Sequence, residues 1–260
     1  MSNEYHEANR RRWDAGSDAW ARRADTRGIW RKCHRDPSLA LHPDELRWLS
    51  HVAGRHVAVL GSGDNQVVFA LAGLGAQVVS VDISDKQIEV ARERAAILGL
   101  QVEFLRADVV DLSALPAAMF DVVYTGGHLA VWVADLNRCY AEATRVLKPG
   151  GLLIVSEYHP FRRLWAPSAS KLELAFDYFD RGPHRFDAAP DVLYPEPGEL
   201  PQFEFHWTVA DYITAILGAG CQLVHAGEFG TACEAWEGAP VTGLPGSLLL
   251  VARRVAQTGA

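Results

Sequence analysis

From residue 56 onward, short runs of apolar, largely β-branched residues alternate with segments that place apolar side chains at helical spacing. Runs of this kind are typical of strands buried on both faces, and their alternation with helices predicts a parallel sheet covered on each side. We therefore expect one doubly wound α/β domain. The runs lie at residues 56–60, 77–81, 102–105, 121–124 and 152–156.

Helical signals fill the gaps between these strands. Val67, Leu71 and Leu74 follow one another at i, i+4 and i+7, which predicts a helix from about residue 65. Ser84 is a typical N-cap for the next helix, and Gly99 suits its end. Beyond the fifth strand the pattern weakens, and then it predicts a strand at 203–207, a helix at 209–217 and a last strand at 248–253.

These signals divide the domain, residues 1–260, into four parts. The stretch after the fifth strand is rich in Pro and aromatic residues and has no clear period, and connections of this length usually form binding loops or lids. The expected parts are an N-terminal helical cap at 1–50, a cofactor-binding core at 55–157, a substrate lid at 158–201 and C-terminal strands and helix at 202–260.

Length and composition narrow the class of protein. The chain has 260 residues, of which 49% are hydrophobic, which is enough to bury a full core. Its start is polar and basic, and no apolar run approaches the roughly 20 residues that span a bilayer, so we expect a soluble, cytoplasmic protein. The four cysteines form no CxxC pair, and no histidine pattern indicates a metal site, so we assign no metal.

The formal net charge of -7 argues against a partner made of phosphates, because sequence-independent nucleic-acid affinity comes from Lys and Arg. The first 35 residues are an exception, since they are basic and contain Trp13, Trp20 and Trp30. This stretch is either a solvated helical face whose tryptophans pack on the body or a contact for an anionic substrate group. We expect neither a nucleic-acid partner nor a membrane partner.

A glycine pair, Gly61 and Gly63, follows the first strand. Glycines between a strand and a helix let the backbone approach a ligand, while the helix start presents amides to its polar atoms. Asp82 ends the second strand about twenty residues later, where a carboxylate can bind a ribose diol. Gln66 replaces the third glycine of a dinucleotide fingerprint, and Asp108 adds a carboxylate after the third strand, so S-adenosylmethionine is favoured over a dinucleotide.

Together, residues 57–65, Asp82, residues 106–108 and the Leu-Lys-Pro-Gly-Gly sequence at 147–151 resemble the motifs of class I S-adenosylmethionine-dependent methyltransferases. The likeness covers roughly residues 55–157. It implies a Rossmann-like seven-stranded sheet whose last strand is antiparallel, with S-adenosylmethionine over the carboxyl ends of the first strands. The acceptor would lie over the fourth and fifth strands.

The same resemblance assigns parts of the cofactor to individual loops. It places the glycine pair at the methionine part, Asp82 at the ribose, Asp108 at the adenine and residues 126–128 beside the sulfonium. Val59 and Asn65 depart from the family pattern, which has an acidic residue and a third glycine there, although Asn tolerates a left-handed backbone. The implied set is Gly61, Ser62, Gly63, Asn65, Asp82, Ile83, Ala107, Asp108, Val109, Gly126, Gly127 and His128.

The tripeptide Glu157-Tyr158-His159 follows the fifth strand, where the acceptor is expected. In an extended chain Glu157 and His159 point to one side, and a His oriented by a carboxylate is a recognised general base. We therefore predict these three residues to be catalytic. The alternative is that His159 caps the strand, Tyr158 packs under the lid and Glu157 pairs with Arg162 or Arg163.

Aromatic residues indicate an apolar pocket for a small aromatic or heteroaromatic acceptor. The Glu-Tyr-His sequence is also similar to that of natural-product methyltransferases, including those that methylate carbon 3 of an indole. A non-catalytic S-adenosylmethionine-binding module and a nicotinamide-dependent oxidoreductase remain alternatives. The residues expected to contact the acceptor are Trp20, Trp30, Trp132, Phe161 and Trp165.

Overall fold

Seven strands form one mixed sheet at the centre of the computed structural model, which describes residues 3–63, 65–166, 171–186, 200–230 and 240–256. Their order is β3-β2-β1-β4-β5-β9-β8, and β9 runs antiparallel to both of its neighbours. This arrangement confirms the predicted fold class. The strands are β1 (His56–Leu60), β2 (Gln77–Asp82), β3 (Val102–Arg106), β4 (Phe120–Gly126), β5 (Leu147–Tyr158), β8 (Cys221–Gly230) and β9 (Pro245–Arg254).

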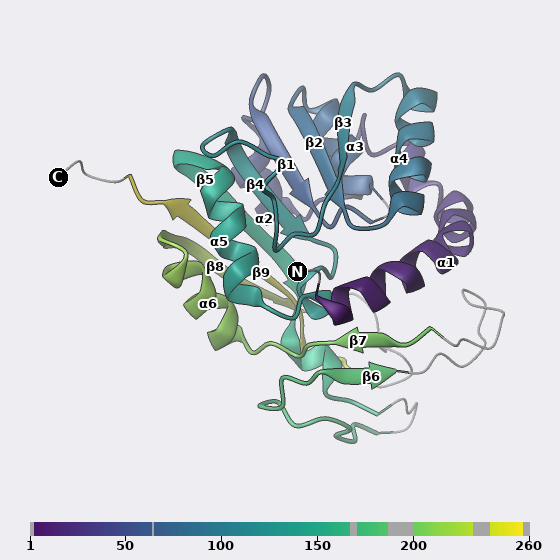
Figure 1. The fold of residues 1–260 in the computed structure, drawn as a ribbon, viewed down its shortest axis with the longest axis vertical. Helices are drawn as coiled ribbons and strands as arrows, with labels where there is room; N and C mark the ends of the chain where they lie inside the picture. Colours follow the sequence, from purple (N-terminus) through teal and green to yellow (C-terminus); the bar gives the residue numbers. More distant parts are fainter. Residues whose placement is uncertain (1–2, 64, 167–170, 187–199, 231–239, 257–260) are drawn as a thin grey trace.

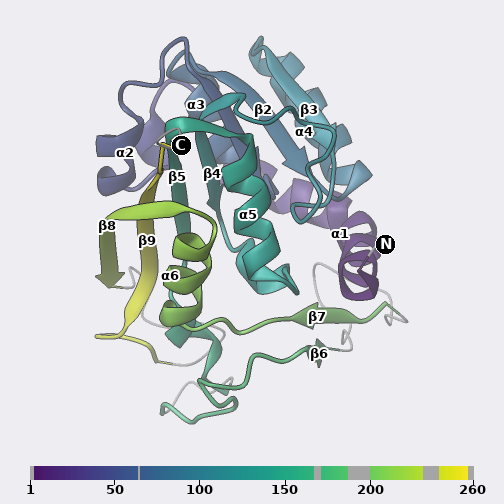
Figure 2. The same cartoon turned by 60° about the vertical axis from the view of Figure 1, so that its left-hand side comes forward.

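Helices cover both faces of this sheet (Figures 1 and 2). Side chains of β1 alternate between two hydrophobic cores, with Ala58 and Leu60 in the core beneath α5 and α6, and Val57 and Val59 in the core beneath α2 and α3. The two-residue period of a strand produces this alternation. The helices are α2 (Pro43–Leu49), α3 (Gln66–Gly73), α4 (Asp85–Leu98), α5 (Leu136–Val146) and α6 (Val209–Gly218).

Local capping fixes where the core helices begin and end. Ser84 caps α4 by accepting the N–H of Gln87 at 3.1 Å, and Gly99 ends the same helix in the left-handed region at φ 67°. Asp135 caps α5 through the N–H of Arg138 at 2.9 Å. The predicted N-cap and C-cap of α4 are thereby confirmed.

A long N-terminal helix, α1 (Glu4–Arg27), lies across the carboxyl ends of β1, β2 and β3 (Figure 1). Beyond it lies a two-stranded sheet of β6 (His184–Phe186) and β7 (Gln202–Glu204). Asn9 of α1 joins this small sheet, because its side chain accepts the N–H of Phe203 at 2.7 Å and donates to the carbonyl of the same residue at 2.9 Å. The helix therefore lies between the edge of the main sheet and the small sheet.

One strand prediction needs correction, and one strand was not predicted. Residues 203–207 do not form a strand of the main sheet, because the strand there ends at Glu204 and pairs with β6. Its expected place is taken by β8, which the sequence pattern did not indicate. β8 lies at the edge of the sheet, its exposed positions alternate with partly buried ones, and it contains two glycines. It therefore lacks the continuous apolar run by which the central strands were recognised.

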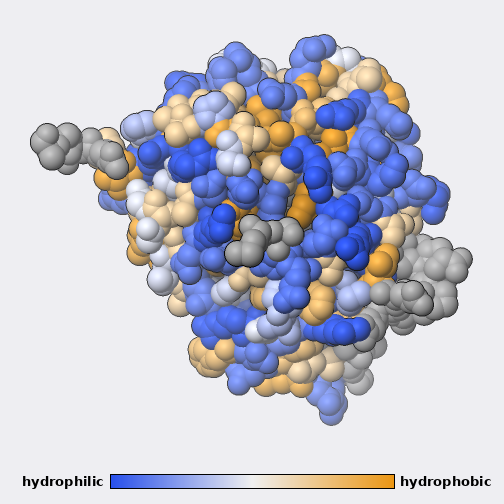
Figure 3. Space-filling model, viewed as in Figure 1, coloured by the Kyte–Doolittle hydropathy of each residue, from blue (hydrophilic) through white to orange (hydrophobic). Residues whose placement is uncertain are grey.

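The surface around the start of α1 is mainly hydrophilic (Figure 3). Cys33, Cys139 and Cys221 are buried free thiols, and Cys233 lies outside the described residues. Within the described part of the chain, no helix has both the length and the apolar character that crossing a bilayer requires.

Candidate active site

The turn after β1 leaves room for a ligand beside the backbone. It holds Gly61, Gly63 and Asn65 in the left-handed region, at φ 63°, 46° and 67°. A Cβ at Gly61 would lie 2.3 Å from Cδ1 of Leu129, whereas one at Gly63 would meet nothing closer than 3.9 Å. The turn is thus packed tightly against the loop after β4 at its first glycine and open at its second. Asn65 adopts the backbone that was predicted for it.

The carboxylate of Asp82 lies beside this turn, at the end of β2, and is 8% exposed. Its Oδ2 accepts the N–H of Gly63 at 3.1 Å, and its Oδ1 accepts that of Ser84 at 2.9 Å. Burial raises the pKa of Asp82, while these backbone amides favour its charged form. Each oxygen retains a further acceptor site, so the arrangement fits a ribose diol. Ser62 instead turns toward β2, where its Oγ accepts from Ser80 Oγ at 2.7 Å.

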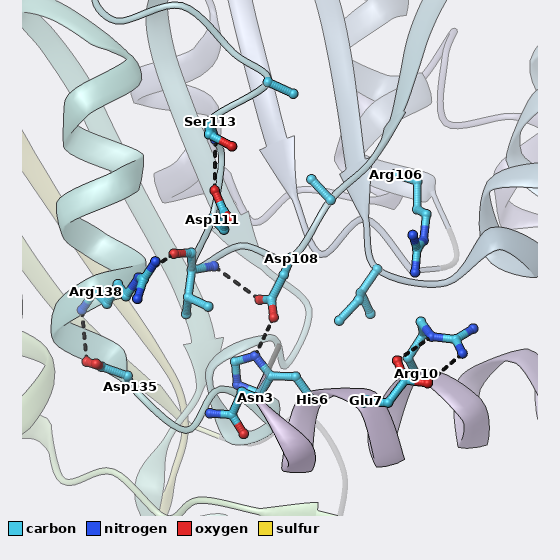
Figure 4. A pocket seen from close by; sticks show the side chains of 14 residues that line it. Asn3, His6, Glu7, Arg10, Arg106, Asp108, Asp111, Ser113, Asp135 and Arg138 are labelled. Atoms are coloured by element: carbon cyan, nitrogen blue, oxygen red, sulfur yellow. Dashed lines mark hydrogen bonds and ion pairs between the residues drawn. The ribbon is translucent and has the colours of Figure 1, made fainter. Parts of the chain in front are cut away.

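Asp108 stands after β3 and is bound to the N-terminal helix. Its Oδ1 accepts the N–H of Val110 at 3.1 Å, and its Oδ2 lies 2.7 Å from Nδ1 of His6 (Figure 4). His6 in turn accepts the N–H of Ala134 at 2.8 Å through Nε2. His6 was not predicted as a site residue, because nothing in the sequence connects it with Asp108.

A cavity of about 580 Å³ opens between α1 and the ends of β2 and β3 (Figure 4). Three of the predicted cofactor residues line it: Ile83, Ala107 and Asp108. Val109 is not among the residues that line this cavity, whereas Val110 is, and both valines belong to the core beneath α5 and α6. The charged side chains that flank the cavity are Glu7, Arg10 and Arg106 on one side and Asp111, Asp135 and Arg138 on the other.

Glu157 binds the backbone of the loop after β4. Gly127 and His128 take left-handed backbone angles there, at φ 65° and 83°. Glu157 Oε1 accepts the N–H of Ala130 at 3.3 Å, and its carboxyl also binds the amides of His128 and Leu129. The carboxyl is 4% exposed, and burial raises its pKa to about 8 against the opposing effect of the amides. Glu157 thus fixes an otherwise unfavourable backbone.

The predicted pair of Glu157 and His159 is not formed. His159 is 1% exposed, its Nε2 lies 2.8 Å from Oε1 of Glu228 on β8, and its Nδ1 accepts the N–H of Phe161 at 3.2 Å. Burial lowers the pKa of His159, while Glu228 raises it. Both ring nitrogens already have partners, so the prediction of a general base oriented by Glu157 is wrong. His159 caps the 3-10 turn Pro160–Arg163, whereas the alternative interpretation had it capping the strand.

His128 and Tyr158 face each other above β4 and β5, with their rings 4.9 Å apart. Nε2 of His128 contacts the guanidinium of Arg163, which also lies 3.5 Å from Glu204 on β7. Burial, followed by the positive charge of Arg163, lowers the pKa of His128 well below its usual range. The imidazole is therefore neutral at physiological pH.

Tryptophans from two elements extend this group of rings. Trp132 packs edge-on against His128 at 5.6 Å and against Trp13 of α1 at 5.4 Å, and Trp13 lies 5.9 Å from Trp20. Two of the predicted acceptor residues, Trp20 and Trp132, therefore belong to one cluster. Trp13 was not assigned to it, although its spacing of seven from Trp20 is that of one helical face.

The other predicted acceptor residues lie elsewhere. Trp30 is 2% exposed in the core and packs on Phe69 of α3 at 6.5 Å, so its assignment to the acceptor is wrong. Phe161 packs against Tyr178 at 5.4 Å, and Trp165 forms a β-bridge with Leu174 in the segment after β5.

Known proteins share both the sequence and the fold of this chain. A family profile described as a methyltransferase domain matches residues 58–155. The ubiquinone biosynthesis O-methyltransferase of Thiobacillus denitrificans is 29% identical over 167 residues, which are 63% of this chain and 69% of that protein. The enzyme of the same name from Xanthomonas axonopodis is 28% identical over 71% of this chain and 75% of its own.

The solved structure of an S-adenosylmethionine dependent methyltransferase from Mesorhizobium loti superposes with a TM-score of 0.62 at 26% identity, over 81% of this chain and 96% of its own. The matched region contains the turn after β1 and Asp82, and also Asp108, which lines the cavity. The chain is an enzyme that depends on S-adenosylmethionine and carries a methyltransferase domain at residues 58–155.

Proposed function

We propose that the protein methylates a small aromatic or heteroaromatic molecule. The observation that carries this proposal is the cluster of Trp13, Trp20, Trp132 and His128, which adjoins the end of β4. Edge-on rings of this kind leave flat apolar faces for another ring to pack against. The names of the relatives favour a hydroxyl oxygen as the methylated atom, and the sequence Glu-Tyr-His favours an indole as the second acceptor class.

Asp82 would hold the ribose of S-adenosylmethionine, Asp108 its adenine, and the turn that contains Gly61 and Gly63 would lie beside its methionine part. When bound, S-adenosylmethionine supplies a methyl group on a positively charged sulfur. Displacement of that methyl group depends mainly on alignment of the acceptor behind it, because a well-oriented pair of reactants gains a large effective concentration. In this proposal the tryptophan cluster orients the acceptor ring and excludes water.

The predicted catalytic tripeptide would divide its roles. Tyr158 and the neutral ring of His128 would be the polar groups beside the substrate. The hydroxyl oxygen of Tyr158 can accept a hydrogen bond from the substrate's hydroxyl or N–H, whereas Nε2 of His128 already accepts from Arg163 and leaves its ring only a donor. Glu157 and His159 would position them, the first through the loop after β4 and the second through the turn that carries Arg163. The proposal therefore assigns proton removal to no buried carboxylate.

Titration calorimetry with S-adenosylmethionine, S-adenosylhomocysteine and NAD tests the cofactor part of the proposal. We expect micromolar binding of the first two and none of NAD. Asp82→Asn should weaken the binding of both, whereas Asp111→Asn, in the cavity lining but outside the predicted cofactor residues, should not. Methyl transfer to phenols or indoles, with none to oligonucleotides, would support the acceptor class. Tight binding without transfer to any acceptor would favour a non-catalytic binding module instead, and binding of NAD alone would favour an oxidoreductase.

A further inference from the structure

His6 joins three parts of the molecule at the edge of the cavity. It lies near the start of α1 and is 4% exposed. Its Nδ1 is 2.7 Å from Oδ2 of Asp108, and its Nε2 is 2.8 Å from the amide nitrogen of Ala134. The helix, the loop after β3 and the segment before α5 therefore meet at one imidazole (Figure 4).

The contact with Ala134 fixes which nitrogen of His6 carries the proton. A backbone N–H can only donate, so Nε2 is the unprotonated acceptor and the hydrogen of the neutral ring lies on Nδ1. Nδ1 therefore donates to Oδ2 of Asp108, while Oδ1 accepts the N–H of Val110 at 3.1 Å. With one hydrogen bond on each oxygen, the carboxylate presents its remaining acceptor sites to the cavity in a fixed orientation.

Building on the proposed function, we propose that His6 is a positioning residue through which Asp108 selects the amino group of adenine. A carboxylate oxygen in a fixed orientation accepts a hydrogen bond from an amino group. A carbonyl at the same ring position would place its own oxygen, which cannot donate, against that carboxylate oxygen. Sites built around a buried hydrogen-bonding group reject a ligand that leaves this group unpaired. Without its donor on α1, the Asp108 side chain can turn, and the difference between the two ligands should shrink.

The test compares S-adenosylhomocysteine with S-inosylhomocysteine, in which a carbonyl replaces the adenine amino group, by titration calorimetry. We expect the wild-type protein to prefer the first by roughly 10- to 100-fold, the range for a hydrogen bond to a charged group. His6→Gln places its amide near Nε2 and lacks a donor at Asp108, so its preference should fall to about 3-fold or less. His6→Asn places its amide nitrogen near Nδ1 and should keep most of the preference.

Asn9→Ala is the matched control, because Asn9 lies three residues further along α1 and binds the backbone of Phe203 instead of Asp108. This variant should lower the affinity for both ligands by the same factor and leave the ratio of the two affinities unchanged. If His6→Gln does the same, His6 only docks the helix and the proposal is overturned. Equal wild-type affinities for the two ligands would also overturn it. Wild-type protein that binds neither ligand would instead refute the proposed function, and thermal melting verifies that each variant is folded.

Discussion

The Glu157→Gln variant should be more stable than the wild-type protein, and its advantage should grow as the pH rises. The folded-state pKa of this carboxyl is raised from 4.5 to about 8, so between these values the folded state holds a proton that the unfolded chain releases. Wild-type stability should therefore fall from about pH 4.5 to pH 8. The two pKa values differ by about 3.5, and at about 1.4 kcal/mol per pH unit the full loss is at most about 5 kcal/mol.

Glu157→Gln lacks this titration but keeps an amide oxygen for the N–H of Ala130. Urea unfolding of both proteins at several values between about pH 5 and pH 8 should show nearly equal stability at the acidic end and a growing advantage of the variant toward pH 8. Glu89→Gln, on the exposed side of α4, is the control and should follow the wild type. Parallel curves for Glu157→Gln and wild type would mean that the loop amides outweigh burial and keep the carboxyl ionised.

Three other substitutions test the site. Asp82→Ala should weaken S-adenosylhomocysteine binding by about 1.5 to 3 kcal/mol in calorimetry, the value of a hydrogen bond to a charged group, and unchanged affinity would exclude Asp82 from the site. Gly61→Ala should lower the melting temperature more than Gly54→Ala, because both have positive φ but only the first Cβ collides with Leu129; equal melting would contradict this. Trp132→Ala should raise KM for the acceptor at least several-fold with cofactor affinity retained, and an unaltered KM would remove it from the acceptor wall.

The cofactor edge of the site was predictable because of a property of parallel sheets. Asp82 ends the buried strand β2, Asp108 follows its parallel neighbour β3, and the carboxyl ends of parallel strands meet at one edge of the sheet. The order of the strands did not have to be known to predict that these two carboxylates lie at the same edge of the sheet. β8 was missed for the opposite reason, since an edge strand is covered incompletely and its sequence alternates without a continuous apolar run.

The pairing of Glu157 with His159 failed because a shared strand face does not fix which groups the side chains on it contact. β5 ends at Tyr158, and His159, whose backbone is still extended, caps the 3-10 turn Pro160–Arg163. Their partners, the amides at 128–130 and Glu228, come from a distant loop and from the strand that was not predicted. A local pattern can indicate that residues share a face, but partners that are remote in sequence depend on the packing of the whole sheet.

One face of α1 makes contacts that neither the shared edge of parallel strands nor the two-residue period of a strand predicts. His6, Asn9 and Trp13 follow at intervals of three and four, and they contact Asp108, β7 and Trp132 respectively. Because one rigid helix contacts the cofactor side, the small sheet and the tryptophan cluster, a ligand that holds α1 in place also orders the acceptor wall. We therefore expect S-adenosylhomocysteine to increase affinity for the acceptor, and the acceptor to increase affinity for S-adenosylhomocysteine by the same factor. Titration of each ligand with and without the other measures this factor, and a factor of one would show that α1 is equally fixed in the free protein.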